Sequence, residues 1–155
     1  MAYNTIKLKK YSDVIEEHLA GGTIYPGMLL IQSAADTVVA HNDDAPVNCI
    51  PMFALEDELQ GKGINDAYAS GDQVQVWIPG RGDQVYALLE DGASVTPATF
   101  LESNGSGLLQ AYTSGKAIAV ALETLDLTGS SGGNLAQNEY LAPFGYARRI
   151  KVRII

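Results

Sequence analysis

The sequence predicts an all-β domain, a small barrel or sandwich with at most short helices. Short segments that alternate apolar and polar residues are separated by Gly, Pro, Asn and Asp turns about every ten residues. The chain has 155 residues, 46% of them hydrophobic, enough for one core. Its single cysteine, Cys49, excludes an internal disulfide, and its apolar neighbours favour a buried thiol. We therefore expect one soluble domain, made in the cytoplasm.

The beginning of the chain differs from the rest. Residues 5–9 alternate apolar and polar side chains, which is typical of a short extended segment with one apolar face. Residues 12–22 then suggest a helix of two turns, with a polar cap and two closing glycines. We interpret residues 1–22 as an N-terminal arm and residues 23–155 as the β-barrel domain.

Strands are expected in order after this arm. A Pro-Gly turn at 26–27 leads into a buried strand at 28–31, and residues 36–47 suggest a second strand that ends in an acidic turn. Residues 53–63 are expected to form a helical turn or a loop. Further strands are expected at 72–78, 84–90, 98–103, 107–115, 116–126 and 148–155. The glycine-rich residues 127–136 indicate a loop rather than a linker, because too few residues follow for a second core.

The strands at 72–78 and 84–90 are expected to form a hairpin around "PGRGD". This tip contains Arg81-Gly82-Asp83, a tripeptide that can serve as a receptor ligand when it is exposed. Glycine, aspartate and arginine are also what a solvated hairpin tip usually contains, and a three-residue match carries a high risk of coincidence. We favour the turn and keep a ligand as the alternative.

Charge is distributed unevenly along the chain. The net charge is −8, but seven of the ten basic residues lie at the two ends and all 18 acidic residues lie between Asp13 and Glu139. The acidic body argues against a nucleic-acid partner, which it would repel. The basic ends can contact the protein's own acidic body, bind an acidic partner surface, or simply increase solubility.

Residues for catalysis, metal binding or cofactor binding do not emerge from the sequence. His18 and His41 have no further ligand at the spacing of a metal site, and neither a phosphate-binding loop nor a nucleophile elbow is present. The segment "GDQVQV" also occurs in self-cleaving barrels that use a Ser–Lys dyad. Lys62 and Lys116 lie in glycine-rich turns, which disfavours that class. We expect no enzyme activity, no metal and no cofactor.

The order of several short motifs resembles the decoration (cement) proteins of tailed-bacteriophage heads. These motifs are spread over residues 23–126 and are "TIYPGMLLIQ", "FALEDELQGKGINDAYASGDQVQVWIPGRGDQVYALL", "VTPATFLESNGSGLL" and "KAIAVALETLD". The resemblance implies a small tulip-like β-barrel behind an extended N-terminal arm. It also implies attachment to the outside of an expanded capsid, where a homotrimer at three-fold or quasi-three-fold axes resists the pressure of packaged DNA.

For this chain, the resemblance makes the major capsid protein and other copies of the chain the expected partners, on the outer surface of the virion, with no membrane or nucleic acid involved. An extended arm with one apolar face can add to a sheet edge of the capsid protein, with Ile6 and Leu8 filling pockets and the lysines contacting acidic groups. The expected capsid-binding residues of the arm are Tyr3, Thr5, Ile6, Lys7, Leu8, Lys9 and Lys10.

The main alternative is a carbohydrate- or other ligand-binding β-module on a virion surface. In that case Trp77, Tyr86 and Tyr112 would supply flat faces for stacking, although aromatic residues of this kind are equally common at subunit interfaces. A self-cleaving barrel is the third class.

Overall fold

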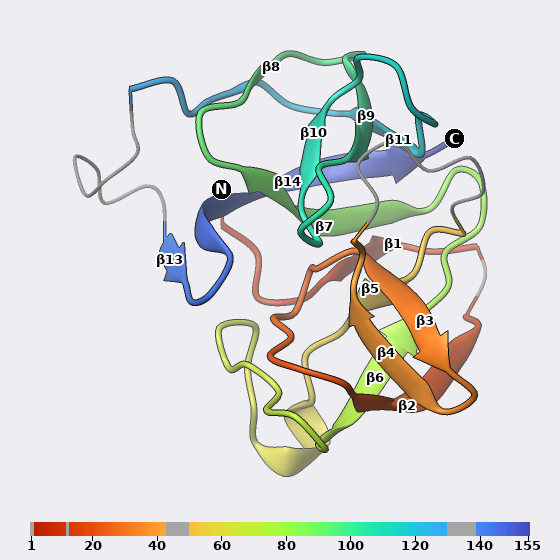
Figure 1. Cartoon of the computed structure of the whole chain (residues 1–155). Helices are drawn as coiled ribbons and strands as arrows, with labels where there is room; N and C mark the ends of the chain where they lie inside the picture. The colour runs from red at the N-terminus through yellow and green to blue at the C-terminus, as the bar shows by residue number, and fades with distance from the viewer. Residues whose placement is uncertain (1, 12, 43–49, 130–138) are drawn as a thin grey trace.

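A computed structural model describes residues 2–11, 13–42, 50–129 and 139–155, and these residues form an almost entirely β architecture (Figure 1). The strands are β1 (Lys7–Lys9), β2 (Ile15–Ala20), β3 (Leu30–Ala34), β4 (Thr37–Ala40), β5 (Phe53–Ala54), β6 (Gln73–Trp77), β7 (Gln84–Glu90), β8 (Ser94–Val95), β9 (Phe100–Ser103), β10 (Leu109–Ala111), β11 (Ala119–Ala121), β12 (Leu125–Asp126), β13 (Glu139–Leu141) and β14 (Gly145–Ile154). Residues 53–63, expected to be a helical turn or a loop, contain a 3₁₀ turn at Glu58–Gln60.

Five strands close into a small barrel in the order β7, β10, β9, β11 and β14, with β14 pairing back to β7. The seam between β14 and β7 is the longest pairing, and it runs from Ala147–Glu90 to Arg153–Gln84. Figure 1 shows these two strands side by side across the upper half of the molecule. The predicted single-domain β-barrel is therefore confirmed.

A second sheet has the order β3-β4-β2-β6-β5 and lies below the barrel in Figure 1. Its hairpin β3–β4 follows the Pro-Gly turn at 26–27, and β6 begins after a turn in which the Asp72 carboxylate accepts the Ala69 N–H at 2.8 Å. The strands β8 and β12 form a small separate pair.

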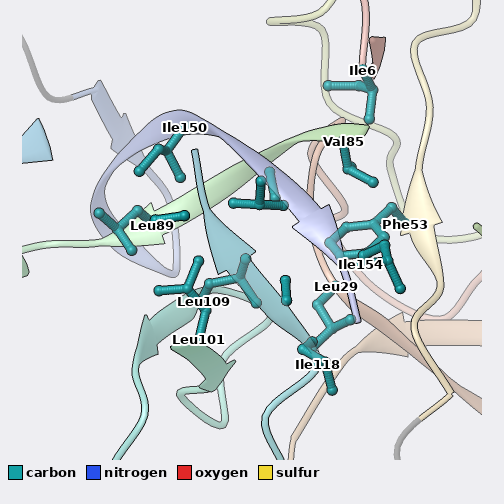
Figure 2. Packing of buried hydrophobic residues seen from close by; sticks show 14 of the residues in the cluster. Ile6, Leu29, Phe53, Val85, Leu89, Leu101, Leu109, Ile118, Ile150 and Ile154 are labelled. Atoms are coloured by element: carbon teal, nitrogen blue, oxygen red, sulfur yellow. The ribbon is translucent and has the colours of Figure 1, made fainter. Parts of the chain in front are cut away.

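Alternation along the strands builds the core. On β7, Val85, Ala87 and Leu89 are buried in the barrel, as the sequence pattern predicted. The second sheet adds Phe53 and Trp77 to the same cluster, so the two sheets share one core. Figure 2 shows Ile6 beside Val85, and Phe53 beside Ile154. A second cluster, which contains Val74 and Val76, packs against the outer side of the barrel at Leu88 and Ala147.

The two-turn helix expected within residues 12–22 is wrong, because Ile15–Ala20 forms β2. A helix of two turns has little stability of its own in water. Pairing of β2 with β6, from Ile15–Trp77 to Leu19–Gln73, supplies hydrogen bonds that a short isolated helix cannot match. Ile15, Glu17 and Leu19 point to one face of the sheet and are all exposed, so the segment lacks the apolar and polar alternation that would have predicted a strand.

Some predicted features lie outside the described residues. They are Ser12 at the start of the expected helix, Cys49, the acidic turn at 43–44 and most of the loop at 127–136. None of the described helical segments is long and apolar enough to cross a membrane.

Gly107 closes the junction between the barrel and the second sheet. Its φ is +79°, and a Cβ atom added there would lie 2.9 Å from the Ala40 Cβ and 3.3 Å from the Leu29 carbonyl oxygen. Its N–H donates to the His41 carbonyl, and its own carbonyl accepts the Leu29 N–H, so the backbone has little room to move.

Replacing Gly107 by alanine is expected to lower the free energy of unfolding by about 2 kcal/mol, because the substitution adds left-handed backbone strain to a steric clash. Urea unfolding measures the loss. Gly92→Ala is the matched control, because Gly92 also has a positive φ (+79°) but has open space where the Cβ would go. Equal losses in the two variants would show that the close approach at Gly107 carries no cost.

Candidate functional site: the N-terminal strand and a basic face

The N-terminal segment is built into the barrel as an edge strand. On the side of β7 away from β14, β10 pairs only at Leu89, which leaves the other end of that edge open. There β1 pairs with β7 at Lys7–Val85 and Lys9–Gln84, and the Tyr86 N–H donates to the Ile6 carbonyl at 2.8 Å. The other edge of β1 has no partner among the described strands.

Two carboxylates fix this segment at its two ends. Before β1, Glu56 accepts the Thr5 hydroxyl at 2.5 Å and the Ile6 N–H at 3.1 Å. After β1, the buried Asp83 accepts the Tyr11 N–H at 2.5 Å and the Gly80 N–H at 2.8 Å. The backbone N–H groups of the segment thus receive charged acceptors, which form stronger hydrogen bonds than neutral ones.

The apolar residues expected to enter pockets of a partner differ in their surroundings. Ile6 is 0% exposed and belongs to the protein's own core, so its side chain is not available to a partner in this conformation. Leu8 is half-buried. Tyr3 is half-buried too, and its ring meets Tyr86 edge-on with the ring centres 5.1 Å apart.

Two of the three lysines of the segment form ion pairs with a carboxylate, and the third does not. Lys10 lies 2.6 Å from Asp13, and Lys7 lies 3.6 Å from the same carboxylate. The hydrogen bond from Lys10, helped by the charge of Lys7, holds the pKa of Asp13 below its usual value. Lys9 is exposed and forms no ion pair with another described residue.

The two basic ends of the chain meet across β7. Gln84 pairs with Lys9 on one side, after a register shift between Lys7 and Lys9, and with Arg153 on the other, so these three residues form one row across β1, β7 and β14. Lys151 lies two positions before Arg153, on the same face of β14. We call Lys9, Lys151 and Arg153 the basic face. None of the three forms an ion pair with a described residue, so their charges are available to an acidic partner.

Exposed aromatic side chains extend the same row. Val120 pairs with Arg153 and with Phe100, and the Tyr112 N–H donates to the Phe100 carbonyl at 2.8 Å. Phe100 is 53% exposed and Tyr112 is 46% exposed. Arginine and exposed aromatic side chains are enriched at protein-binding surfaces, and here Val120 alone separates Arg153 from Phe100 along the row.

A pocket of about 230 Å³ lies next to the N-terminal residues. It is lined by residues that include Tyr3, Tyr86, Glu139 and Arg149. Arg149 donates to the carbonyls of Pro26 (2.9 Å from Nη2) and Ile64 (2.5 Å) and to the Asn65 side-chain oxygen (3.0 Å). Burial lowers the pKa of Arg149. Through these hydrogen bonds the Arg149 side chain links β14 to the loops that contain Pro26 and Ile64–Asn65.

The Arg81-Gly82-Asp83 tip is explained by the turn. Gly82 has φ +96°, a conformation that glycine adopts at little cost. The Asp83 side chain is 0% exposed and accepts backbone N–H groups, so the tripeptide does not present its carboxylate to a receptor. Arg81 alone is exposed.

The two histidines considered as metal ligands, His18 and His41, each lie within hydrogen-bond distance of another side chain. His41 Nδ1 lies 2.8 Å from the Ser103 hydroxyl, a contact between residues 62 positions apart that no local pattern predicts, and both residues are buried. Because neither side chain is accessible, this pair stabilises the core and is not a nucleophile open to substrate. His18 Nε2 lies 2.8 Å from Glu16, while its Nδ1 is buried without a hydrogen-bond partner.

The proposed aromatic faces for stacking a sugar are not all exposed. Trp77 is 0% exposed in the shared core, which overturns its assignment as a stacking platform. Tyr86 is half-buried against Tyr3, and only Tyr112 is well exposed. Among the described residues, no cluster of three or more His, Cys, Asp or Glu side chains is arranged to hold a metal ion.

The sequence matches no model of a known protein family, and no curated protein is similar enough to match it.

Proposed function

We propose that this protein is a capsid decoration (cement) protein, which binds the outer surface of a tailed-phage head and stabilises it against the pressure of packaged DNA. Its role is structural and not enzymatic. The observation that carries the proposal is the basic face: three cations without ion-pair partners among the described residues, set on the N-terminal strand β1 and on β14 of the barrel. The order of motifs along residues 23–126 supplies the link to phage heads.

The mode of attachment follows from the docked N-terminal strand. Because Ile6 is part of the core, the segment contacts the major capsid protein without leaving the barrel. The open edge of β1 offers backbone N–H and C=O groups to a sheet edge of the capsid protein. At the same time Lys9, Lys151 and Arg153 contact acidic groups on the head.

Single contacts of this kind are weak, but a homotrimer that makes three sets of them at once binds the head with much higher affinity. Exposed ion pairs contribute at most about 1 kcal/mol each. Three linked copies at a three-fold axis bind as one multivalent unit, whose affinity exceeds that of each copy by orders of magnitude. A trimer also suits a clamp, because it joins several capsid subunits at once.

Reversing the charges of the basic face should weaken binding to heads. The variant Lys9→Glu/Lys151→Glu/Arg153→Glu is expected to bind heads assembled without the protein at least about tenfold more weakly than the wild type. Co-sedimentation with the heads measures binding, and heat-induced release of DNA measures stabilisation of the head. Because the side chains are at the surface, the variant should keep its fold, which circular dichroism verifies.

The matched control reverses the three basic residues of the acidic body, Lys62, Arg81 and Lys116, which changes the net charge by the same amount. This control should bind heads like the wild type. The proposal fails if the two triple variants bind alike, if wild-type protein leaves the temperature of DNA release unchanged, or if a glycan array reveals a specific carbohydrate ligand.

A further inference from the structure

β2 has an open edge beside its first residues. On one side it pairs with β6 along its length, from Ile15–Trp77 to Leu19–Gln73. On the other side β4 pairs only with Leu19 and Ala20. Among the described strands, none pairs with Ile15–His18 on that side. Figure 1 shows β2 at the lower boundary of the molecule, below β4 and β6.

The hydrogen bonds of β2 show which backbone groups face this opening. Val14 and Ala20 bond toward β6: the Val14 carbonyl accepts the Ile78 N–H, and the Ala20 N–H donates to the Asp72 carbonyl. In an antiparallel pair, alternate residues bond to opposite sides. The N–H and C=O of Ile15 and of Glu17 therefore face away from β6. At the end of the opening, the Leu19 N–H already donates to the Asp36 carbonyl, at 2.7 Å.

The side chains around the opening are apolar and acidic. Val14 is 50% exposed, Ile15 38% and Leu19 42%, so apolar surface borders the unpaired backbone. Glu16, Glu17 and Asp36 are exposed carboxylates at the same edge. Glu17 accepts amide N–H groups from Gln73 (2.6 Å) and Gln75 (2.8 Å), which keep it in place but do not neutralise its charge.

We propose that this edge of β2 is a docking site for an extended basic segment of a partner protein, which adds as a strand in line with β4. The backbone of Ile15 and Glu17 bonds the incoming strand. Residues of the partner that lie on the face of Ile15 and Leu19 are apolar, and residues opposite Glu16 and near Asp36 are lysine or arginine. The inference does not depend on the role in capsid decoration, because it uses a different sheet.

A labelled heptapeptide, Lys-Thr-Lys-Val-Lys-Thr-Lys, tests the proposal in fluorescence anisotropy at low salt. We expect saturable binding to the whole protein. The same peptide with N-methyl groups on alternate residues keeps its charges but cannot pair as a strand, and it should bind at least about tenfold more weakly. The peptide with Glu in place of Lys should not bind.

Variants locate the binding edge. Ile15→Pro removes an N–H that faces the opening and breaks no bond to β6, so the fold should persist while peptide binding falls about tenfold. Ile15→Ala, which keeps the N–H, is the matched control for the lost side chain. Glu16→Lys should weaken binding, whereas Glu58→Lys, the same charge change on the 3₁₀ turn, should not.

Three outcomes would overturn the proposal. Equal binding of the N-methylated peptide would mean attraction by net charge alone. Equal binding to Ile15→Pro and Ile15→Ala would place the peptide elsewhere. Absence of binding to the wild type would mean that Glu16 and Glu17 serve only to repel other strands, as charges on exposed edges often do. If the Ile15→Pro variant does not fold, peptide binding to Glu16→Lys and to Glu58→Lys is compared instead. Weaker binding to Glu16→Lys alone supports the proposal, and equal binding to the two variants contradicts it.

Discussion

Replacing Ile6 by alanine is expected to lower the free energy of unfolding by about 3 kcal/mol. The side chain is fully buried beside Val85, and its removal leaves a cavity where the N-terminal strand meets the barrel (Figure 2). The surrounding side chains belong to paired strands and cannot collapse fully into the space. Urea unfolding followed by Trp77 fluorescence measures the loss, since Trp77 belongs to the same cluster.

Leu8→Ala is the control within the same strand. Leu8 is only half-buried, and its truncation should cost about 1 kcal/mol. Similar, small losses in both variants would show that the N-terminal segment is not packed on the barrel in solution. The result bears on the function as well, because an undocked segment would expose Ile6 to a partner and a docked one offers only the edge of β1 and the lysines.

Replacing Glu102 by glutamine is expected to cost about 2–3 kcal/mol at neutral pH. The side chain is 1% exposed and organises the loop after β10. Its Oε1 accepts the Thr113 hydroxyl (2.6 Å), the Thr113 N–H (3.1 Å) and the Gln110 amide (3.1 Å), and its Oε2 accepts the Gly115 N–H (2.7 Å). A glutamine has one oxygen only, so its NH₂ group would face a donor.

The same contacts make this stability depend on pH. Burial by itself raises the pKa of Glu102, but the hydrogen bonds from Thr113, Gly115 and Gln110 together outweigh it, and the pKa falls below the usual 4.5. The folded state therefore binds the proton less readily than the unfolded state. The contribution of the carboxylate is complete above the unfolded value near 4.5 and is lost as pH falls through the lower, folded value.

Urea unfolding of the wild type and of Glu102→Gln between about pH 3 and pH 7 checks both parts of this prediction. The difference between the two proteins should be largest near neutrality and should shrink as the pH falls below 4.5. A difference that stays constant with pH would mean that the charge of Glu102 contributes nothing. Glu58→Gln, at an exposed site on the 3₁₀ turn, should leave both the stability and its pH dependence unchanged.

Local pattern was sufficient to predict most of the β structure. The alternation in residues 84–90 gave both β7 and its inward side chains, and the turn "PGRGD" was identified as a turn from its glycines and aspartate. The same alternation in β14 buries Ile150, Val152 and Ile154. These predictions held because side-chain direction in a strand has a period of two residues, which a short window of sequence contains in full.

Elements whose state depends on a distant partner were not predictable in this way. Residues 15–20 carry weak helical signals, and only the presence of β6 makes them a strand. Glu56 accepts the N–H of Ile6, which lies 50 positions earlier in the sequence, and Asp83 accepts the N–H of Tyr11, which lies 72 positions earlier. With 18 acidic residues in the chain, no local feature distinguished these two from the others.

The amino-acid sequence by itself determined that this chain forms one β domain with basic ends and an acidic body, because composition and a two-residue period are local properties. Only the tertiary structure decided that the first strand completes the edge of β7, that this places Lys9 in one row with Arg153, and that β2 keeps an open edge. Strand pairing joins residues far apart in sequence, and the free energy that selects one pairing over another comes from the core that all the strands bury together.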